Sequence, residues 1–248
     1  MQPKQMIRQL RETSSRYGAR AALHDLHCRL VNRVVSFNVL RAMRVSMDDV
    51  PSGEMFEAPG FDARFLSPAE LEAKAREGTH DFSPEFLARA RARGDRCYGI
   101  FDGDTLASHG WYAERATPIN EHYTLHFDAA YTYMFKGWTL PAYRGQRLHA
   151  IGMCRALRAF SEEGKKGLVS YVASNNFASL RSVARMGYRI FGNLYLARSG
   201  GHALAFASGG CLPYGVRATV TDPGGAAPVV DPTLPPPATA VYRRLSWQ

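Results

Sequence analysis

Hydrophobic positions near the start of the chain recur at the spacing of a helix. Leu23, Leu26, Leu30, Val34, Phe37 and Leu40 follow one another at steps of three or four residues. This spacing puts them on one face of an α-helix. A weaker helical pattern precedes them, from Lys4 to Arg16. The pattern therefore predicts an N-terminal helical arm over residues 1–46.

Residues 47–208 alternate between strand and helix patterns. A strand is predicted from Phe61 to Leu66, followed by a helix that begins at Ser67, where Pro68 and Glu70 complete a capping box. A second helix runs from Ser83 to Gly94. Two β-rich runs then flank Asp102-Gly103, which predicts a hairpin.

A long aromatic strand, 130–140, precedes the helix that ends near Gly164. The strand "GLVSYVAS", a helix "NFASLRSVARMG" closed by Gly187 and two further strands follow. The order β, α, α, β, β, β, α, β, α, β, β predicts an α/β fold on a mixed sheet. Residues 209–248 are rich in Pro and Gly and are predicted to form an extension.

Charge is concentrated in the arm. The whole chain of 248 residues has a net charge of +9. Residues 1–45 hold nine Lys and Arg against two acidic residues, so this segment supplies +7. The arm either packs on its own domain with a solvated basic face, or touches anionic lipid or an acidic partner. It lacks the interleaved aromatic and basic residues that stack bases, which argues against nucleic acid.

The four cysteines lie far apart and form no CxxC pair, so neither a zinc site nor a redox motif is expected. No apolar secretory segment stands in the first thirty residues, and no run of eighteen apolar residues occurs. We therefore expect free thiols, a cytoplasmic location with peripheral membrane contact through the arm as an option, and no metal.

Two motifs carry candidate chemistry. In "TLPAYRGQRLHAIG", a strand ends at a basic Tyr-Arg-Gly turn and a helix follows. A helix N-terminus with nearby arginines suits an anion, commonly a phosphate. The second motif, "VASNNFASLRSVARMGY", begins at Val172 and ends with Gly187 and Tyr188.

Together these motifs resemble the GCN5-related N-acetyltransferase (GNAT) superfamily, over roughly residues 55–208. The resemblance implies a splayed mixed sheet flanked by helices, and an acyltransferase that uses acetyl-CoA or another acyl-CoA. Its fourth and fifth strands would part at a bulge, expected near Gly137, to admit the pantetheine arm. The implied donor-binding residues are Gly137, Trp138, Thr139, Tyr143, Arg144, Gly145, Gln146, Arg147, Leu148, His149, Asn176 and Ser179.

The chain departs from the family pattern at three positions. Arg147 and His149 stand where the family has small residues, so they either narrow the pyrophosphate cradle or point to solvent. Val183 replaces the tyrosine that often serves as general acid, which leaves Ser179 as a candidate for that role. Tyr188 is expected to pack in the core.

An acyl transfer to an amine needs a base that removes the proton of the amine. The candidates lie in "INEHYTLHFDAAY", and His126 and Asp128 are the first choices, ahead of Glu121 and His122. Residues 67–95 and 113–129 are expected to shape the acceptor site.

Three functions remain open from the sequence. The first is an N-acyltransferase that uses acyl-CoA and acts on a small-molecule or peptide amine. The second uses an acyl-carrier protein as donor, an acidic partner that the basic surface would suit. The third is a non-catalytic protein that binds an acyl donor, or that acts through its arm.

Overall fold

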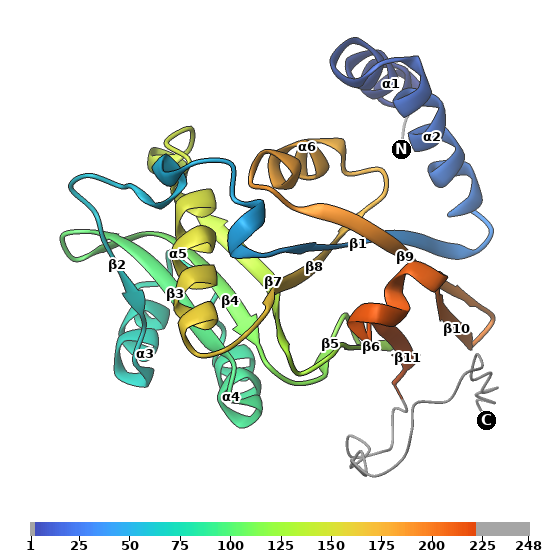
Figure 1. Ribbon diagram of the computed structural model, residues 1–248. Helices are drawn as coiled ribbons and strands as arrows, with labels where there is room; N and C mark the ends of the chain where they lie inside the picture. The colour runs from blue at the N-terminus through green and yellow to red at the C-terminus, as the bar shows by residue number, and fades with distance from the viewer. Residues whose placement is uncertain (1–2, 222–248) are drawn as a thin grey trace, which may run out of the picture.

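The computed structural model describes residues 3–221, which form one large mixed sheet with helices on both faces (Figure 1). The eight strands of this sheet lie in the order β10-β9-β1-β8-β7-β4-β3-β2. They are β1 (Ser36–Val45), β2 (Asp62–Phe65), β3 (Arg96–Asp102), β4 (Thr105–Ala113), β7 (Tyr131–Thr139), β8 (Gly167–Ala173), β9 (Arg189–Ser199) and β10 (His202–Ala207). A second sheet has the order β11-β6-β5, with β5 (Thr117–Pro118), β6 (Tyr123–His126) and β11 (Arg217–Val220).

The predicted order of eleven elements is confirmed. The strands β2, β3, β4, β7, β8, β9 and β10 are joined by α3 (Pro68–Glu77), α4 (Pro84–Arg93), α5 (Leu148–Glu162) and α6 (Phe177–Arg185) in that order. The predicted hairpin at Asp102-Gly103 joins β3 to β4. The expected α/β fold, a mixed sheet flanked by helices, is therefore present.

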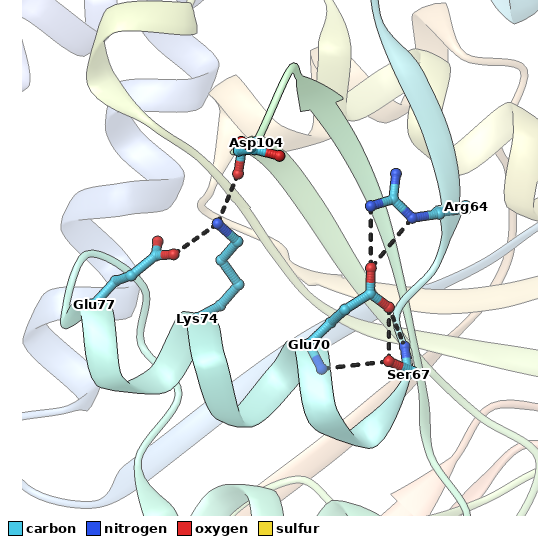
Figure 2. Close-up of polar contacts among 6 residues, drawn as sticks. All are labelled: Arg64, Ser67, Glu70, Lys74, Glu77 and Asp104. Carbon is cyan, nitrogen blue, oxygen red and sulfur yellow. Dashed lines mark hydrogen bonds and ion pairs between the residues drawn. The ribbon is translucent and has the colours of Figure 1, made fainter.

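The helix caps form as the sequence predicts. Figure 2 shows Ser67 and Glu70 at the start of α3, where the Ser67 Oγ accepts from the Glu70 backbone N–H at 3.3 Å and the Ser67 backbone N–H donates to Glu70 Oε2 at 2.7 Å. Arg64 donates to the other oxygen of Glu70, and Lys74 pairs with Glu77. The Ser83 Oγ caps α4 in the same way, and Gly94 ends it in the left-handed conformation. These local bonds fix where each helix begins and ends.

The interior divides across the two faces of the large sheet. On one face α5 and α6 cover a core built around Met43, Tyr112 and Phe160. On the other face α3 and α4 cover a second cluster, which contains Phe101, Leu106 and Trp111. The small sheet covers a third cluster on that face, which contains Leu40, Ala42, Tyr133, Val169, Leu194 and Leu196.

The N-terminal arm is a hairpin of two helices, α1 (Pro3–Tyr17) and α2 (Ala19–Val31). The predicted helix through Phe37 and Leu40 is wrong, because Ser36–Val45 forms β1 between β8 and β9. The boundary predicted at residue 46 thus falls at the end of a strand of the sheet. The elements from Gly209 to Val220, including β11, belong to the folded region. The Pro-rich part of the predicted extension lies outside the described residues.

Among the residues that the structure describes, no helix is both long enough and apolar enough to cross a bilayer.

Candidate functional site

The parallel strands β7 and β8 part from each other in the middle of the sheet. They pair only from Tyr131 with Gly167 to Tyr133 with Val169. Beyond that point β7 continues to Thr139 on β4, and β8 continues to Ala173 on β1. The outer half of β7 therefore turns one edge toward the gap between the two strands. Main-chain groups on such an edge can pair with an extended ligand.

The bulge in β7 lies two residues before its predicted position. Trp111 pairs with Lys136 and Tyr112 pairs with Met134, so Phe135 is the extra residue. Gly137 pairs in register with Gly110. The bulge is thus near Gly137, as predicted, but it does not include this glycine, which has another role.

A side chain of β8 marks the point where the two strands part. The Ser170 Oγ donates to the Met134 carbonyl at 2.9 Å, so a hydroxyl takes the place of a ladder hydrogen bond. No motif in the sequence predicts this contact, because it joins two residues that only the folded sheet brings together.

Gly137 makes room for the imidazole of His149. A Cβ built on Gly137 would lie 2.1 Å from His149 Cε1, so the ring rests on the backbone of β7. Burial lowers the pKa of His149, which favours the neutral imidazole. His149 therefore occupies the face of outer β7 on the side of α5. The ring thus packs against β7 instead of pointing to solvent, and the narrowing of a pyrophosphate cradle stays a prediction.

In the turn before α5, a residue other than glycine adopts the left-handed backbone conformation that glycine favours. Arg147 is the N-cap of α5 and has φ 60°, the one non-glycine positive φ among residues 3–221. Gly145, two residues earlier, has φ 89°, and a Cβ added there would have nothing within 4 Å. No side chain caps α5, so its first-turn N–H groups are left for solvent or an anion.

The other residues of this turn divide between structure and exposure. Arg144 and Gln146 are exposed, and the Arg144 guanidinium lies 5.1 Å from the centre of the Trp138 ring. The Leu148 side chain is buried in the core, so only its backbone could meet a ligand. The Tyr143 hydroxyl donates to Asp102 Oδ2 at 2.8 Å, which anchors the turn to the β3–β4 hairpin. Thr139 likewise bonds through Oγ1 with Ser108 Oγ at 2.9 Å.

The second motif lies at the end of β8, across the gap from the α5 turn. Asn176 is the N-cap of α6, and its Oδ1 accepts from the Ser179 backbone N–H at 3.2 Å. The capping role of Asn176 is thus confirmed, while contact with a donor stays a prediction, as does the acid role of Ser179. Tyr188 is buried with its hydroxyl 3.6 Å from Met153 Sδ, so its predicted place in the core is confirmed.

The two preferred base candidates lie in structural hydrogen bonds. His126 is on β6, where its Nε2 lies 2.9 Å from Thr219 Oγ1, and burial lowers its pKa to about 4. Asp128 Oδ1 accepts from the Ala130 backbone N–H at 2.8 Å, in the turn at the closed end of the β7–β8 pair. These bonds give both side chains a fold-stabilising task, and their catalytic role stays a prediction.

A polar hollow of about 340 Å³ opens on the face opposite α5 and α6. It lies on β1 and β9, where Asn38 pairs with Leu196. This pair comes just beyond the pairing of Leu40 with Ala173, the last residue of β8, so the hollow is at the end of the sheet where β7 and β8 diverge. Glu121 and His122 border it and lie 3.1 Å apart through Oε1 and Nε2. The residues around the hollow are Ser36, Asn38, Asn120, Glu121, His122, Tyr123, Leu196 and Arg198.

A buried histidine pair lies on the same face, beneath α3 and α4. The His80 and His109 rings are 5.4 Å apart, and neither nitrogen of His109 has a hydrogen-bond partner. Burial, with added repulsion from His80, Lys136 and His149, lowers the pKa of His109 to about 3. Sequence reasoning missed this pair, because neither histidine belongs to a motif.

Neither a family model nor a curated protein matches this chain. Among solved structures, a putative GNAT acetyltransferase from Novosphingobium aromaticivorans is 19% identical over 64% of this chain and 62% of its own, with a TM-score of 0.44. A GCN5-related N-acetyltransferase from Kribbella flavida is 17% identical over 70% of this chain and 63% of its own, with a TM-score of 0.44. A GNAT acetyltransferase from Colwellia psychrerythraea is 13% identical over 64% and 55%, also at 0.44.

This chain thus spans less than two thirds of each neighbour's own length. The likeness is partial, so the features of the site are those of this chain itself: its strand order, the parted β7 and β8, and the helix that follows each of them. Within residues 3–221 no group of three or more side chains is placed to hold a metal ion.

Proposed function

We propose that this chain is an N-acyltransferase that moves an acyl group from a pantetheine thioester to an amine. The observation that carries the proposal is the parted β7–β8 pair, with an uncapped helix N-terminus after β7 and Asn176 after β8. The edge of β7 offers main-chain groups to the amides of a pantetheine arm. The first turn of α5, with Arg144 and Arg147 beside it, offers N–H groups and positive charge to its phosphates.

The chemistry would be a direct attack of the amine on the thioester. The neutral amine nitrogen bonds to the carbonyl carbon, the intermediate collapses, and the carbon–sulfur bond breaks to release a thiolate. One proton leaves the amine and one reaches the thiolate. The hollow at the diverging end of the sheet gives the amine an entry on the face opposite α5. Glu121 and His122, the second choices for the base from the sequence, border this hollow.

The donor is proposed to be acetyl-CoA or a longer acyl-CoA. An acyl-carrier protein is the second candidate, favoured by one observation: the turn before α5 holds two bulky side chains, Arg147 at its N-cap and His149 after it. A carrier protein presents phosphopantetheine without the adenosine part, so less ligand must pass the crowded turn.

Isothermal titration with CoA tests the donor site directly. We expect CoA to bind the native chain and to bind Arg144→Ala about fivefold or more weakly, because a charge-assisted phosphate contact is lost. Arg76→Ala removes another exposed arginine, which lies on α3, and should leave the affinity unchanged.

Turnover then separates the three functions. Release of thiol from acyl-CoA in the presence of amines would support the first donor, and release from matched acyl-carrier protein alone would support the second. Binding of CoA with no turnover on either donor, over a panel of amines, would favour a donor-binding protein that is not an enzyme. Absence of binding to CoA and to acyl-carrier protein would contradict the proposed site itself.

A further inference from the structure

The outer face of α2 carries apolar side chains that nothing in the described chain covers. Leu23 is 67% exposed and Leu30 is 47% exposed. Val34, in the turn that follows the helix, is 84% exposed. Large aliphatic side chains at this exposure cost free energy in water, and a contiguous row of them commonly marks a contact surface.

These residues form a stripe because of their spacing. At 100° per residue, Leu23, His27 and Leu30 lie within an arc of about 60° on α2. The side chains that dock α2 on the body lie on another face of the helix. His24 contacts Ser174 at 3.0 Å, and Asp25 accepts from Asn175 at 3.2 Å. The stripe therefore points away from the body, which agrees with the projecting position of the hairpin in Figure 1.

Arginines border the stripe. Arg20 precedes it and Arg33 follows it, and both side chains are exposed. The two acidic residues of the arm are already paired, Glu12 with Arg8 at 3.0 Å and Asp25 with Arg29 at 2.7 Å. The outer surface of the hairpin thus keeps its positive charge, and α1 adds exposed Arg11 and the half-exposed Ile7.

We infer that the α1–α2 hairpin binds the surface of an anionic membrane, with Leu23, Leu30 and Val34 in the lipid interface. Helices that lie in this interface combine a narrow apolar face with flanking cations. The long arginine side chains can reach the headgroups while their apolar stems lie along the acyl boundary. None of these residues belongs to the β7–β8 site, so membrane binding is independent of the proposed acyl transfer.

The hairpin would also connect the membrane to that site. The Tyr17 ring packs against Phe177 in a tilted arrangement with ring centres 5.6 Å apart, and the Arg181 guanidinium lies 4.8 Å from the Tyr17 ring. These contacts hold the arm on the first turns of α6, beside Asn176. A hairpin lying on lipid would therefore keep the diverging end of β7 and β8 near the membrane surface.

Co-sedimentation of the full chain with vesicles tests the inference. We expect binding to vesicles of phosphatidylcholine mixed with phosphatidylglycerol, weak binding to pure phosphatidylcholine, and loss of binding at high salt. The triple variant Leu23→Gln, Leu30→Gln, Val34→Gln should bind anionic vesicles at least about tenfold more weakly. The double variant Arg20→Gln, Arg33→Gln should weaken vesicle binding by a similar factor, although its apolar residues are unchanged.

Leu212→Gln is the matched control. It makes the same chemical change at a side chain that is 79% exposed, outside the arm, and it should bind vesicles like the native chain. Membrane binding by the hairpin would be overturned if the native chain preferred no anionic vesicle, or if both arm variants bound like the native chain. A dimer that the triple variant dissociates, with no vesicle binding, would also overturn it by making a second copy the occupant.

Discussion

Replacing Arg147 by glycine should stabilise this protein, although it removes an arginine from the surface. Arg147 has φ 60° at the N-cap of α5, and its side chain is exposed. A left-handed residue with a Cβ costs roughly 1–2 kcal/mol relative to glycine. Glycine gives back about 0.4–1 kcal/mol through the greater freedom of the unfolded chain. The expected net gain is about 0.5–1 kcal/mol, or a rise in Tm of about 1–4 °C for a chain of this size.

Two variants separate the backbone from the charge. Arg147→Ala removes the same charge but keeps a Cβ in the left-handed conformation, so its Tm should stay near that of the native chain. Gln146 has no positive φ, so Gln146→Gly should lower the Tm by about 1–4 °C. Thermal unfolding followed by circular dichroism measures all three.

An Arg147→Gly chain that melts no higher than Arg147→Ala would refute the cost assigned to the left-handed backbone. Donor binding gives a second comparison, because the two variants lose the same arginine. Equal losses of CoA affinity would assign the effect to charge. A smaller loss of CoA affinity for Arg147→Gly than for Arg147→Ala would mean that a Cβ in the left-handed conformation also restricts the turn.

Two further predictions concern interactions that the sequence did not single out. The pKa of His109 is about 3 against an ordinary value near 6.5, so below pH 6.5 the unfolded chain binds more protons than the folded chain. The free energy of unfolding should therefore fall as pH decreases, by about 2 kcal/mol between pH 6.5 and 5. Urea unfolding of His109→Phe should lack this part of the pH dependence, and an unchanged pH dependence would refute the prediction. Gly137→Ala should destabilise the fold by about 1 kcal/mol through contact with His149. In a double-mutant cycle, Gly137→Ala should cost no stability once His149 is replaced by alanine. Additive effects of the two substitutions would show that the ring does not rest on Gly137.

The elements predicted from the sequence are those whose signals are local. Ser67 and Glu70 cap α3 across a single turn, and the β3–β4 hairpin closes on Gly103, so each needs only its near neighbours. The two candidate motifs are of this kind as well, since the turn from Pro141 to Arg147 and the cap at Asn176 are each contained in a few residues.

Strand β1 shows why the rest could not be predicted. Phe37 and Leu40 lie three residues apart, a spacing that puts them on one face of a helix but on opposite faces of this strand. What decides is the pairing of Leu40 with Ala173 on one side and Leu194 on the other, both far along the chain. The apolar pattern is also interrupted by Arg41, whose guanidinium donates to Asn193 Oδ1 at 2.8 Å. No local pattern reports such a partner, so tertiary context overrides the helical spacing.

The same distinction applies inside the site. The pattern that the sequence resembles has small residues at positions 147 and 149, and this sequence has none there, which left open whether the two side chains narrow the cradle or point to solvent. The backbone at Arg147 nevertheless adopts the conformation of a glycine, because the turn between Tyr143, held by Asp102, and the buried Leu148 is fixed at both ends. At position 149 the side chain is large, and the residue without a side chain is Gly137 on the facing strand, which leaves space for the imidazole. A donor that pairs with the edge of β7 must therefore either pass alongside His149 or turn its ring away. That makes the His149 rotamer, rather than the charge of the turn, the feature most able to control whether a pantetheine arm can pair with β7.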